Sequence, residues 1–202
     1  MEGHYTHTIF IVTNCNYMQA GLVTLMSSAQ FPVSVRRISK PEDVLIKLDP
    51  EARSLILVPM FRRNPKVQAR AELFLWKKEL LQHKGVIPQI PCLILGDCWK
   101  HGYQVISEYL TMERIQKKLS EILAHPETAM SNRPLKKTSY RLSPLQEEIL
   151  SGMREGKTVA EIAEKLNVSS GCVFSGRASL ISKLGLKNRL GLMSLTTESM
   201  FT

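Results

Sequence analysis

The chain has 202 residues, a length that suits two domains better than one small domain. Apolar residues make up 44% and charged residues 22%, which excludes a disordered chain because this composition can supply a packed core. The formal net charge of +9 suits a polyanionic partner such as nucleic acid, but it is spread over the whole chain and identifies no function by itself.

The N-terminus and the cysteines indicate a cytoplasmic protein. The first apolar run, residues 9–12, is too short for a signal peptide or a membrane span, so we expect no export and no membrane association. The cysteines form no CxxC pair, and each lies in or beside an apolar run, so we expect buried, reduced thiols. These cysteines are Cys15, Cys92, Cys98 and Cys172.

Strand and helix patterns alternate over residues 8–124. The expected strands lie at residues 8–14, 33–38, 54–60 and 91–96. The expected helices lie at residues 17–28, 41–48, 67–82 and 112–123. Residues 97–111 fit neither pattern clearly. Continuous apolar runs are typical of strands buried on both faces, and their alternation with helices predicts a parallel α/β sheet.

Residues 125–141 have the composition of a linker. They contain two prolines, small polar residues and a basic cluster, and they lack apolar periodicity. The basic side chains of this cluster could contact phosphate, but a solvated linker is the expectation. We therefore predict two separately folding domains, 1–124 and 142–202, joined by a protease-sensitive segment.

The segment from residue 142 onward is helical in pattern. Ser143–Gln146 is a capping box with proline at the first helical position, and it opens a helix that Gly156 ends. Thr158–Glu161 is a second capping box and begins a short helix, and Ser169 caps a third helix. Two short helices joined by a tight turn are typical of a helix-turn-helix, whose second helix can enter a major groove about 12 Å wide.

The stretch from residue 142 to residue 195 resembles the DNA-binding domains of the LuxR or FixJ type. The matching pieces are Leu142-Ser143-Pro144, Glu147, Gly156, Glu161-Ile162-Ala163, Leu166, Val173, Lys183-Leu184-Gly185 and Asn188-Arg189. The resemblance implies a bacterial regulator of transcription that binds double-stranded promoter DNA. It also implies a fourth helix, at about residues 188–200, that makes a dimer contact. The apolar residues that exceed the needs of a three-helix core are Leu190, Leu192, Met193 and Leu195.

The third helix departs from the resembled domains, which usually carry polar or basic side chains over the segment that matches residues 172–179. Here Arg177 is able to make a bidentate contact with guanine, and Phe174 could contact a thymine methyl group. Gly176 should cost about 1 kcal/mol relative to alanine, so we expect it to allow the close approach of a backbone, of DNA or of protein. The predicted DNA-binding residues are Thr158, Ser170, Phe174, Ser175, Arg177, Ser179 and Lys183.

A second hypothesis stays open because of this unusual helix. The helix-turn-helix could dock on another regulator instead of DNA, which would make the chain a protein-only antagonist or co-regulator. Phe174 would then be the dominant contact, because a buried aromatic anchor dominates such interfaces.

The N-terminal domain resembles the receiver domains of response regulators, which have a flavodoxin-like fold, but it lacks their phosphotransfer residues. The matching part is Ala20-Gly21-Leu22. Receivers hold Mg²⁺ with two acidic residues where this chain has Thr13 and Asn14, and Pro59 stands where the acceptor aspartate is expected. Gly96 stands where a serine or threonine ends the fourth strand. The resemblance therefore implies no phosphoacceptor, no metal site and regulation that is independent of aspartyl phosphorylation.

The combination of the two domains resembles auxiliary regulators of capsule, curli or fimbrial genes, some of which work beside a second regulator, so we expect a homodimer or a heterodimer. Some of them bind cyclic di-GMP through a Trp-apolar-Ser/Thr-Arg motif. Tyr109–Met112 matches only the middle two positions and lacks the tryptophan and arginine that would stack on the ligand and pair with it. We expect no cyclic di-GMP, no other cofactor and, in the absence of any catalytic motif, no enzyme.

Overall fold

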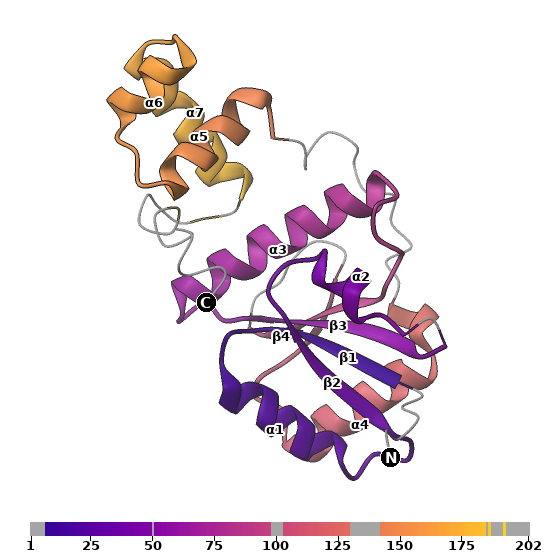
Figure 1. Cartoon of the computed structure of the whole chain (residues 1–202). Coiled ribbons are helices and arrows are strands. Elements are labelled where there is room, and N and C mark those ends of the chain that lie inside the picture. The colour runs from indigo at the N-terminus through magenta and orange to yellow at the C-terminus, as the bar shows by residue number, and fades with distance from the viewer. Residues whose placement is uncertain are drawn as a thin grey trace. The chain divides into compact units, whose positions relative to one another are not determined.

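The computed structural model describes residues 7–49, 51–97, 103–129, 142–184, 186 and 192 (Figure 1). Its contacts divide the chain into two compact units. The first, here called the sheet unit, comprises residues 1–64 and 81–135, and the second, the helical unit, comprises residues 65–80 and 136–202. The separate folding of domains 1–124 and 142–202 stays a prediction, to be tested by limited proteolysis.

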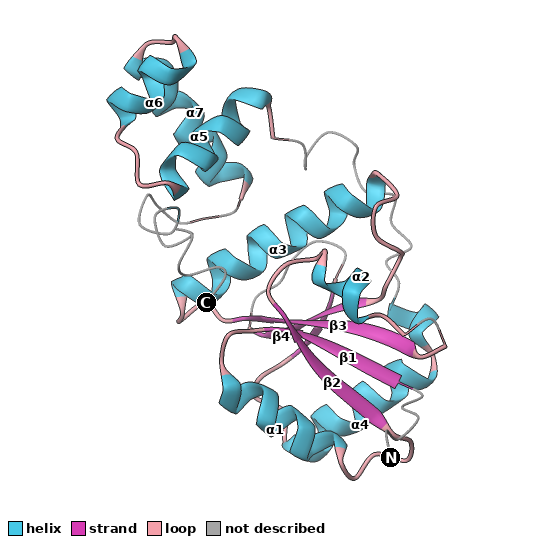
Figure 2. Ribbon diagram, in the orientation of Figure 1, coloured by secondary structure: helices cyan, strands magenta, loops and turns pink. Residues whose placement is uncertain are grey.

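Five parallel strands form the sheet unit, in the order β2-β1-β3-β4-β5 (Figure 2). They are β1 (His7–Val12), β2 (Val33–Ile38), β3 (Arg53–Met60), β4 (Cys92–Gly96) and β5 (Gln104–Ile106). The first strand lies between the second and the third, which is the flavodoxin-like order of doubly wound α/β folds. The predicted fold class and the four predicted strands are confirmed, and β5 lies in the segment that fitted neither pattern.

Two helices lie side by side on one face of the sheet, α1 (Asn16–Met26) and α4 (Met112–Ala124) (Figure 2). Alternate strand residues, among them Ile9 and Leu55, form one core with Leu22 of α1 and Leu119 of α4. All six residues of β1 are buried, as expected for a strand covered on both faces. The remaining helices before the linker are α2 (Asp43–Lys47) and α3 (Pro65–His83).

Part of the segment predicted as linker packs on the sheet unit. Pro126–Ala129 form the 3-10 turn η1, and Ala129 is buried in the core below α4. The amide of the Gln104 side chain donates a hydrogen bond to the carbonyl of Thr128 at 2.9 Å. Residues 130–141 lie outside the described residues.

The expectation of buried thiols is wrong for two of the cysteines. Cys92 is buried in β4, whereas Cys15 is exposed and Cys172 is half-buried. Cys15 is exposed because it occupies the N-cap position of α1, where the chain has already left the sheet interior. Cys98 lies outside the described residues. No helix within the described ranges is long and apolar enough to cross a membrane.

Three helices lie within residues 142–184, as predicted: α5 (Pro144–Arg154), α6 (Val159–Leu166) and α7 (Ser170–Lys183). Both predicted capping boxes are present, at Ser143 and at Thr158. The apolar side chains of the three helices meet in one core, which includes Ile149, Ile162 and Leu180. The predicted fourth helix falls on residues that the structure does not describe, apart from Leu192, which is buried in this core.

Glycines allow the three helices to approach closely. A Cβ atom at Gly152 would lie 2.7 Å from Cγ1 of Ile162, and a Cβ atom at Gly176 would lie 2.5 Å from Cδ1 of Ile149. Both distances are shorter than a van der Waals contact between carbon atoms. The expectation that Gly176 faces a backbone of DNA or protein is therefore wrong, because the space beside it is filled by the Ile149 side chain of α5.

Gly176→Ala should lower the free energy of unfolding by about 1–2 kcal/mol, because the overpacking against Ile149 outweighs the gain in helix propensity. Ile149→Val removes Cδ1 and should by itself cost about 1 kcal/mol. In that background Gly176→Ala should be neutral or stabilising. Chemical denaturation of the wild-type chain, the two single variants and the double variant, followed by circular dichroism, gives the four free energies of unfolding. A stabilising Gly176→Ala in the otherwise unchanged chain would contradict this explanation.

Candidate nucleic-acid interface

The turn between α6 and α7 is built from local hydrogen bonds. Asn167 ends α6 in the left-handed conformation (φ 52°), which asparagine tolerates better than most residues. Ser169 caps α7, and its hydroxyl accepts a hydrogen bond from the amide of Cys172 at 3.2 Å. These residues set the direction of α7 relative to α6, as the sequence predicted.

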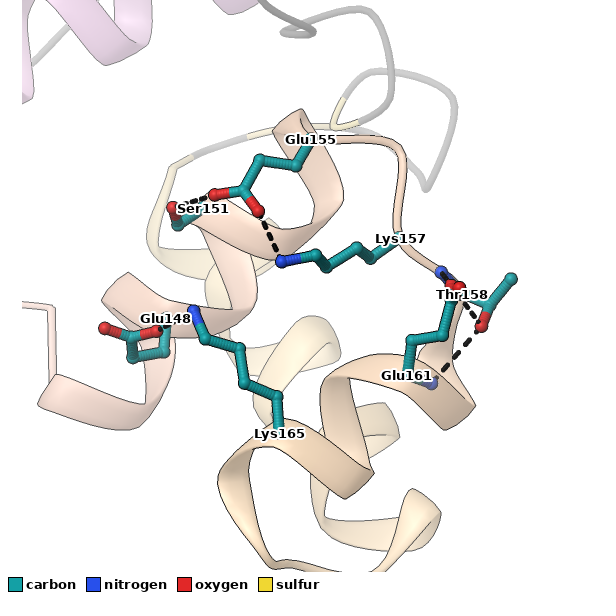
Figure 3. Close-up of polar contacts among 7 residues, drawn as sticks. All are labelled: Glu148, Ser151, Glu155, Lys157, Thr158, Glu161 and Lys165. Atoms are coloured by element: carbon teal, nitrogen blue, oxygen red, sulfur yellow. Dashed lines mark hydrogen bonds and ion pairs between the residues drawn. The ribbon is translucent and has the colours of Figure 1, made fainter.

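Ion pairs and hydrogen bonds lie on the exposed sides of α5 and α6, and one ion pair joins the two helices (Figure 3). Lys165 of α6 pairs with Glu148 of α5 at 3.0 Å, and Lys157 pairs with Glu155 at 2.6 Å. Each pair is solvent-exposed, so each adds little to stability. At the start of α6, the backbone amide and the hydroxyl of Thr158 both donate to Oε2 of Glu161, at 2.6 and 2.7 Å.

The capping box of α6 should make stability depend on pH. The hydrogen bond from the backbone amide of Thr158, followed by that from its hydroxyl, lowers the pKa of Glu161 from its usual value of 4.5. Because the folded-state pKa is the lower one, this stabilisation is present above the unfolded-state pKa and is lost as the pH falls through the folded-state pKa.

Glu161→Gln keeps a side-chain acceptor at this position but removes the charge. The wild-type chain should be more stable than this variant at neutral pH, and the difference should shrink as the pH falls below 4.5. Urea denaturation across this pH range measures the difference, with Glu164→Gln on the same helix as the control for loss of a charge. If the difference in stability does not change with pH, the stabilisation does not come from the ionised carboxylate of Glu161.

The exposed face of α7 presents few polar groups. Phe174 is 48% exposed and lies on this face with Ser175 and Ala178. The guanidinium of Arg177 lies over the Phe174 ring, with its carbon 4.8 Å from the ring centroid. This is the geometry of a cation–π contact, so the two predicted base-contacting residues are a coupled pair and not independent groups.

Ser179 and Lys183 are both held by Gln146, a buried residue of α5. The side-chain amide of Gln146 donates to the Ser179 hydroxyl at 2.9 Å, and its carbonyl accepts from Nζ of Lys183 at 2.9 Å. The same carbonyl accepts from the amide of Ser143, which completes the capping box. Sequence analysis identified Gln146 only as a capping residue, because its partners on α7 are more than thirty positions away.

The structure therefore brings four of the seven predicted DNA-binding residues together as two pairs. Phe174 contacts Arg177, and Ser179 is linked to Lys183 through Gln146. The other three are exposed, with Thr158 and Ser170 at the N-termini of α6 and α7 and Ser175 on the open face of α7. Their contact with DNA stays a prediction.

The carboxyl edge of the sheet differs from a phosphotransfer site. The Thr13 hydroxyl accepts a hydrogen bond from the amide of Cys15 at 3.0 Å. A Cβ atom at Gly96 would lie 2.0 Å from the carbonyl oxygen of Met60, so the end of β3 takes the space of a side chain there. Asp97, which the sequence analysis did not weigh, accepts from the amide of Arg62 at 2.8 Å. Within the described residues, no three His, Cys, Asp or Glu side chains gather to hold a metal ion.

Comparison with known proteins agrees with this geometry for the C-terminal part of the chain. Residues 140–196 match the family model of bacterial regulatory proteins, luxR family. These residues form a LuxR-type helix-turn-helix domain. The LuxR-type domain is also 43% identical over 54 residues to the transcriptional regulatory protein RcsB of Escherichia coli strain K12, and equally to RcsB of Salmonella typhimurium strain LT2. The match covers 27% of this chain and about a quarter (25%) of the length of these relatives.

Solved structures of response regulators are similar over nearly the whole chain, at low identity. A complex of RcsB with DNA has 19% identity and a TM-score of 0.42, covering 98% of this chain and 100% of that one. Full-length FixJ from B. japonicum has 17% identity and a TM-score of 0.38, covering 96% and 98%.

Proposed function

We propose that this chain is a bacterial regulator of transcription that binds double-stranded promoter DNA through α7. The observation that carries the proposal is the pair formed by the exposed Phe174 and the half-buried Arg177 on the third helix of a LuxR-type domain. A guanidinium can donate two hydrogen bonds to O6 and N7 of guanine, and an apolar ring suits the neighbouring thymine methyl group. The cation–π contact orients the guanidinium before DNA arrives, which lowers the entropy lost on binding.

The remaining predicted residues suit contacts with the DNA backbone. Ser170 stands at the N-terminus of α7, where backbone amides and the helix dipole attract phosphate. The amide and the hydroxyl of Thr158 already donate to the carboxylate of Glu161, so a phosphate contact at Thr158 would have to replace that carboxylate. Ser175, Ser179 and Lys183 supply hydroxyl and ammonium donors along α7. Such contacts position the protein on the duplex, whereas Arg177 and Phe174 would discriminate between bases.

We also propose that the regulator works without aspartyl phosphorylation, in the cytoplasm and without catalysis of its own. Thr13 and Asn14 supply no carboxylate for Mg²⁺, Pro59 supplies no acceptor, and the Met60 carbonyl lies against Gly96. Binding of cyclic di-GMP is not part of the proposal, because Tyr109–Met112 lacks the required tryptophan and arginine.

The active species is proposed to be a homodimer or a heterodimer with a second regulator. The predicted dimer helix lies outside the described residues, except for Leu192, whose side chain is only 1% exposed within this single chain. Leu192 therefore supports the core, and the dimer contact must come from other residues. Sedimentation of the full chain, with and without DNA, tests the homodimer.

The decisive experiment is selection of duplexes from a random double-stranded library by the full chain, followed by titration of the selected duplex across a salt series. Each phosphate contact should give a slope of about −0.9 in log K against log salt. Pretreatment with acetyl phosphate and Mg²⁺ should neither label the protein nor change its affinity. Failure to enrich any duplex at low salt would refute DNA binding, and stoichiometric, acid-labile labelling would refute phosphorylation independence.

A protein-only antagonist is the second candidate function, and the composition of α7 favours it. The exposed face of this helix carries Phe174, Ala178 and Gly171. Contact with another regulator would bury this apolar surface. An antagonist would enrich no duplex in the selection and would bind its partner regulator with weak dependence on salt.

A further inference from the structure

The side-chain amide of Gln146 is a buried polar group that joins α5 to α7. Gln146 is only 6% exposed, and a buried amide lowers the stability of a fold unless it finds hydrogen-bond partners. Its carbonyl accepts from the backbone amide of Ser143 and from Nζ of Lys183, each at 2.9 Å. Its amino group donates to the Ser179 hydroxyl at 2.9 Å. A capping box needs only the bond with Ser143, so the two bonds with α7 call for a separate explanation.

The partners of Gln146 fix the direction of its amide. A backbone amide and an ammonium group can only donate, so the atom that faces Ser143 and Lys183 has to be the carbonyl oxygen. The amino group is thereby turned toward Oγ of Ser179, to which it donates. The assignment of oxygen and nitrogen follows from these neighbours, because the two ends of the amide have the same shape.

This orientation makes Ser179 a hydrogen-bond donor toward solvent. A hydroxyl group has one hydrogen to donate. Because the oxygen of Ser179 accepts from Gln146, that hydrogen points elsewhere, and no acceptor within the described parts of the chain takes it. The Ser179 side chain is exposed, so its hydrogen can reach a ligand.

Lys183 presents a second donor close to Ser179. The two residues are four positions apart on α7, and residues at this spacing lie on the same face of a helix. Both are exposed, and both contact the same amide group. That group is neutral, so its bond to Lys183 does not offset the positive charge. A hydroxyl donor beside an ammonium suits an anion with several acceptor oxygens, which in duplex DNA is a backbone phosphate.

We propose that Gln146 is a positioning residue for DNA binding, which holds the Ser179 hydroxyl and the Lys183 ammonium so that both donate to the same phosphate. Side chains that are already in place lose less entropy when they bind. The inference rests on the proposed function, because it requires that α7 lies against DNA. It adds to that function a buried residue of α5 that does not itself contact the duplex.

The test measures the affinity of full-length chains for the selected duplex at several salt concentrations. Gln146→Met has a similar shape but no amide, so it should weaken binding about tenfold and make the salt slope shallower by about 0.9, the value for one phosphate contact. In a chain that already carries Ser179→Ala and Lys183→Met, Gln146→Met should have no further effect on affinity. The side chains through which Gln146 acts are then absent, so the effects should not add.

Ser143→Ala is the matched control for the loss of the cap. It removes the hydroxyl that accepts from the backbone amide of Gln146, but it leaves the Gln146 side chain and its partners on α7 unchanged. It should lower the stability of the fold without changing the affinity for DNA.

Gln146→Glu replaces the methionine variant if that one fails to fold, because a carboxylate still accepts from Ser143 and Lys183. It cannot donate to Ser179, so it should draw the hydroxyl hydrogen of Ser179 inward, and it should offset the charge of Lys183. Gln146→Glu should therefore also weaken DNA binding, although it preserves the capping box.

Two outcomes overturn this inference and leave DNA binding in place. In the first, the wild-type chain binds the duplex and the Gln146 variants bind it equally well. In the second, Gln146→Met weakens binding by the same factor with and without Ser179→Ala and Lys183→Met, which would show that the amide only supports the fold. A wild-type chain that enriches no duplex refutes the proposed function itself, and this inference with it.

Discussion

Gly96→Thr, which installs the kind of residue that receiver domains carry at this position, should destabilise the sheet unit by about 3 kcal/mol. Two costs add. Gly96 has φ 149°, in a region that residues with a side chain rarely adopt. A Cβ atom there would lie 2.0 Å from the carbonyl oxygen of Met60 and 2.8 Å from its carbonyl carbon, and a backbone group in a central strand cannot move aside cheaply.

Gly85→Thr is the matched control for this prediction. Gly85 also has a positive φ, of 69°, but a Cβ atom there would meet nothing within 4 Å. Gly85→Thr should lower the free energy of unfolding only by the conformational strain, about 1–2 kcal/mol. Urea denaturation of the full chain compares the two variants. Equal losses would show that the contact with Met60 is unimportant, and a stable Gly96→Thr chain would mean that this edge can still accommodate the receiver residue.

Arg177→Ala should weaken specific DNA binding by about 1–3 kcal/mol, roughly fivefold to 150-fold, because a bidentate contact to guanine is lost. Arg177→Lys keeps the charge but not the planar fork, so it should lose specificity while keeping most of the salt dependence. Competition between the selected duplex and a random duplex, measured at several salt concentrations, separates the two effects.

The contact between Phe174 and Arg177 changes how the Phe174 variants are interpreted. Phe174→Ala removes an apolar contact and also releases the guanidinium from the ring, so the two alanine variants should not be additive. Phe174→Leu keeps apolar volume without a ring and isolates the orienting effect. If Arg177→Ala leaves DNA binding unchanged while Phe174→Ala abolishes association with a partner regulator, the antagonist hypothesis replaces DNA binding.

The sequence by itself determined the features that depend on near neighbours in the chain. Both capping boxes, at Ser143 and Thr158, were predictable because their hydrogen bonds join residues three positions apart. The four expected strands, β1 to β4, and the approximate extent of the helices followed from the pattern of apolar residues, which reports how each segment is buried. The LuxR-type domain was recognisable for the same reason, since its motif consists of such local signals in a set order.

Only the tertiary structure decided which residues meet across the fold. The link from Gln146 to Ser179 and Lys183, the space beside Gly176 and the close approach of Met60 to Gly96 all join residues far apart in the chain. No local pattern encodes these distances, because each is set by the packing of several elements at once and changes with shifts of a few tenths of an ångström.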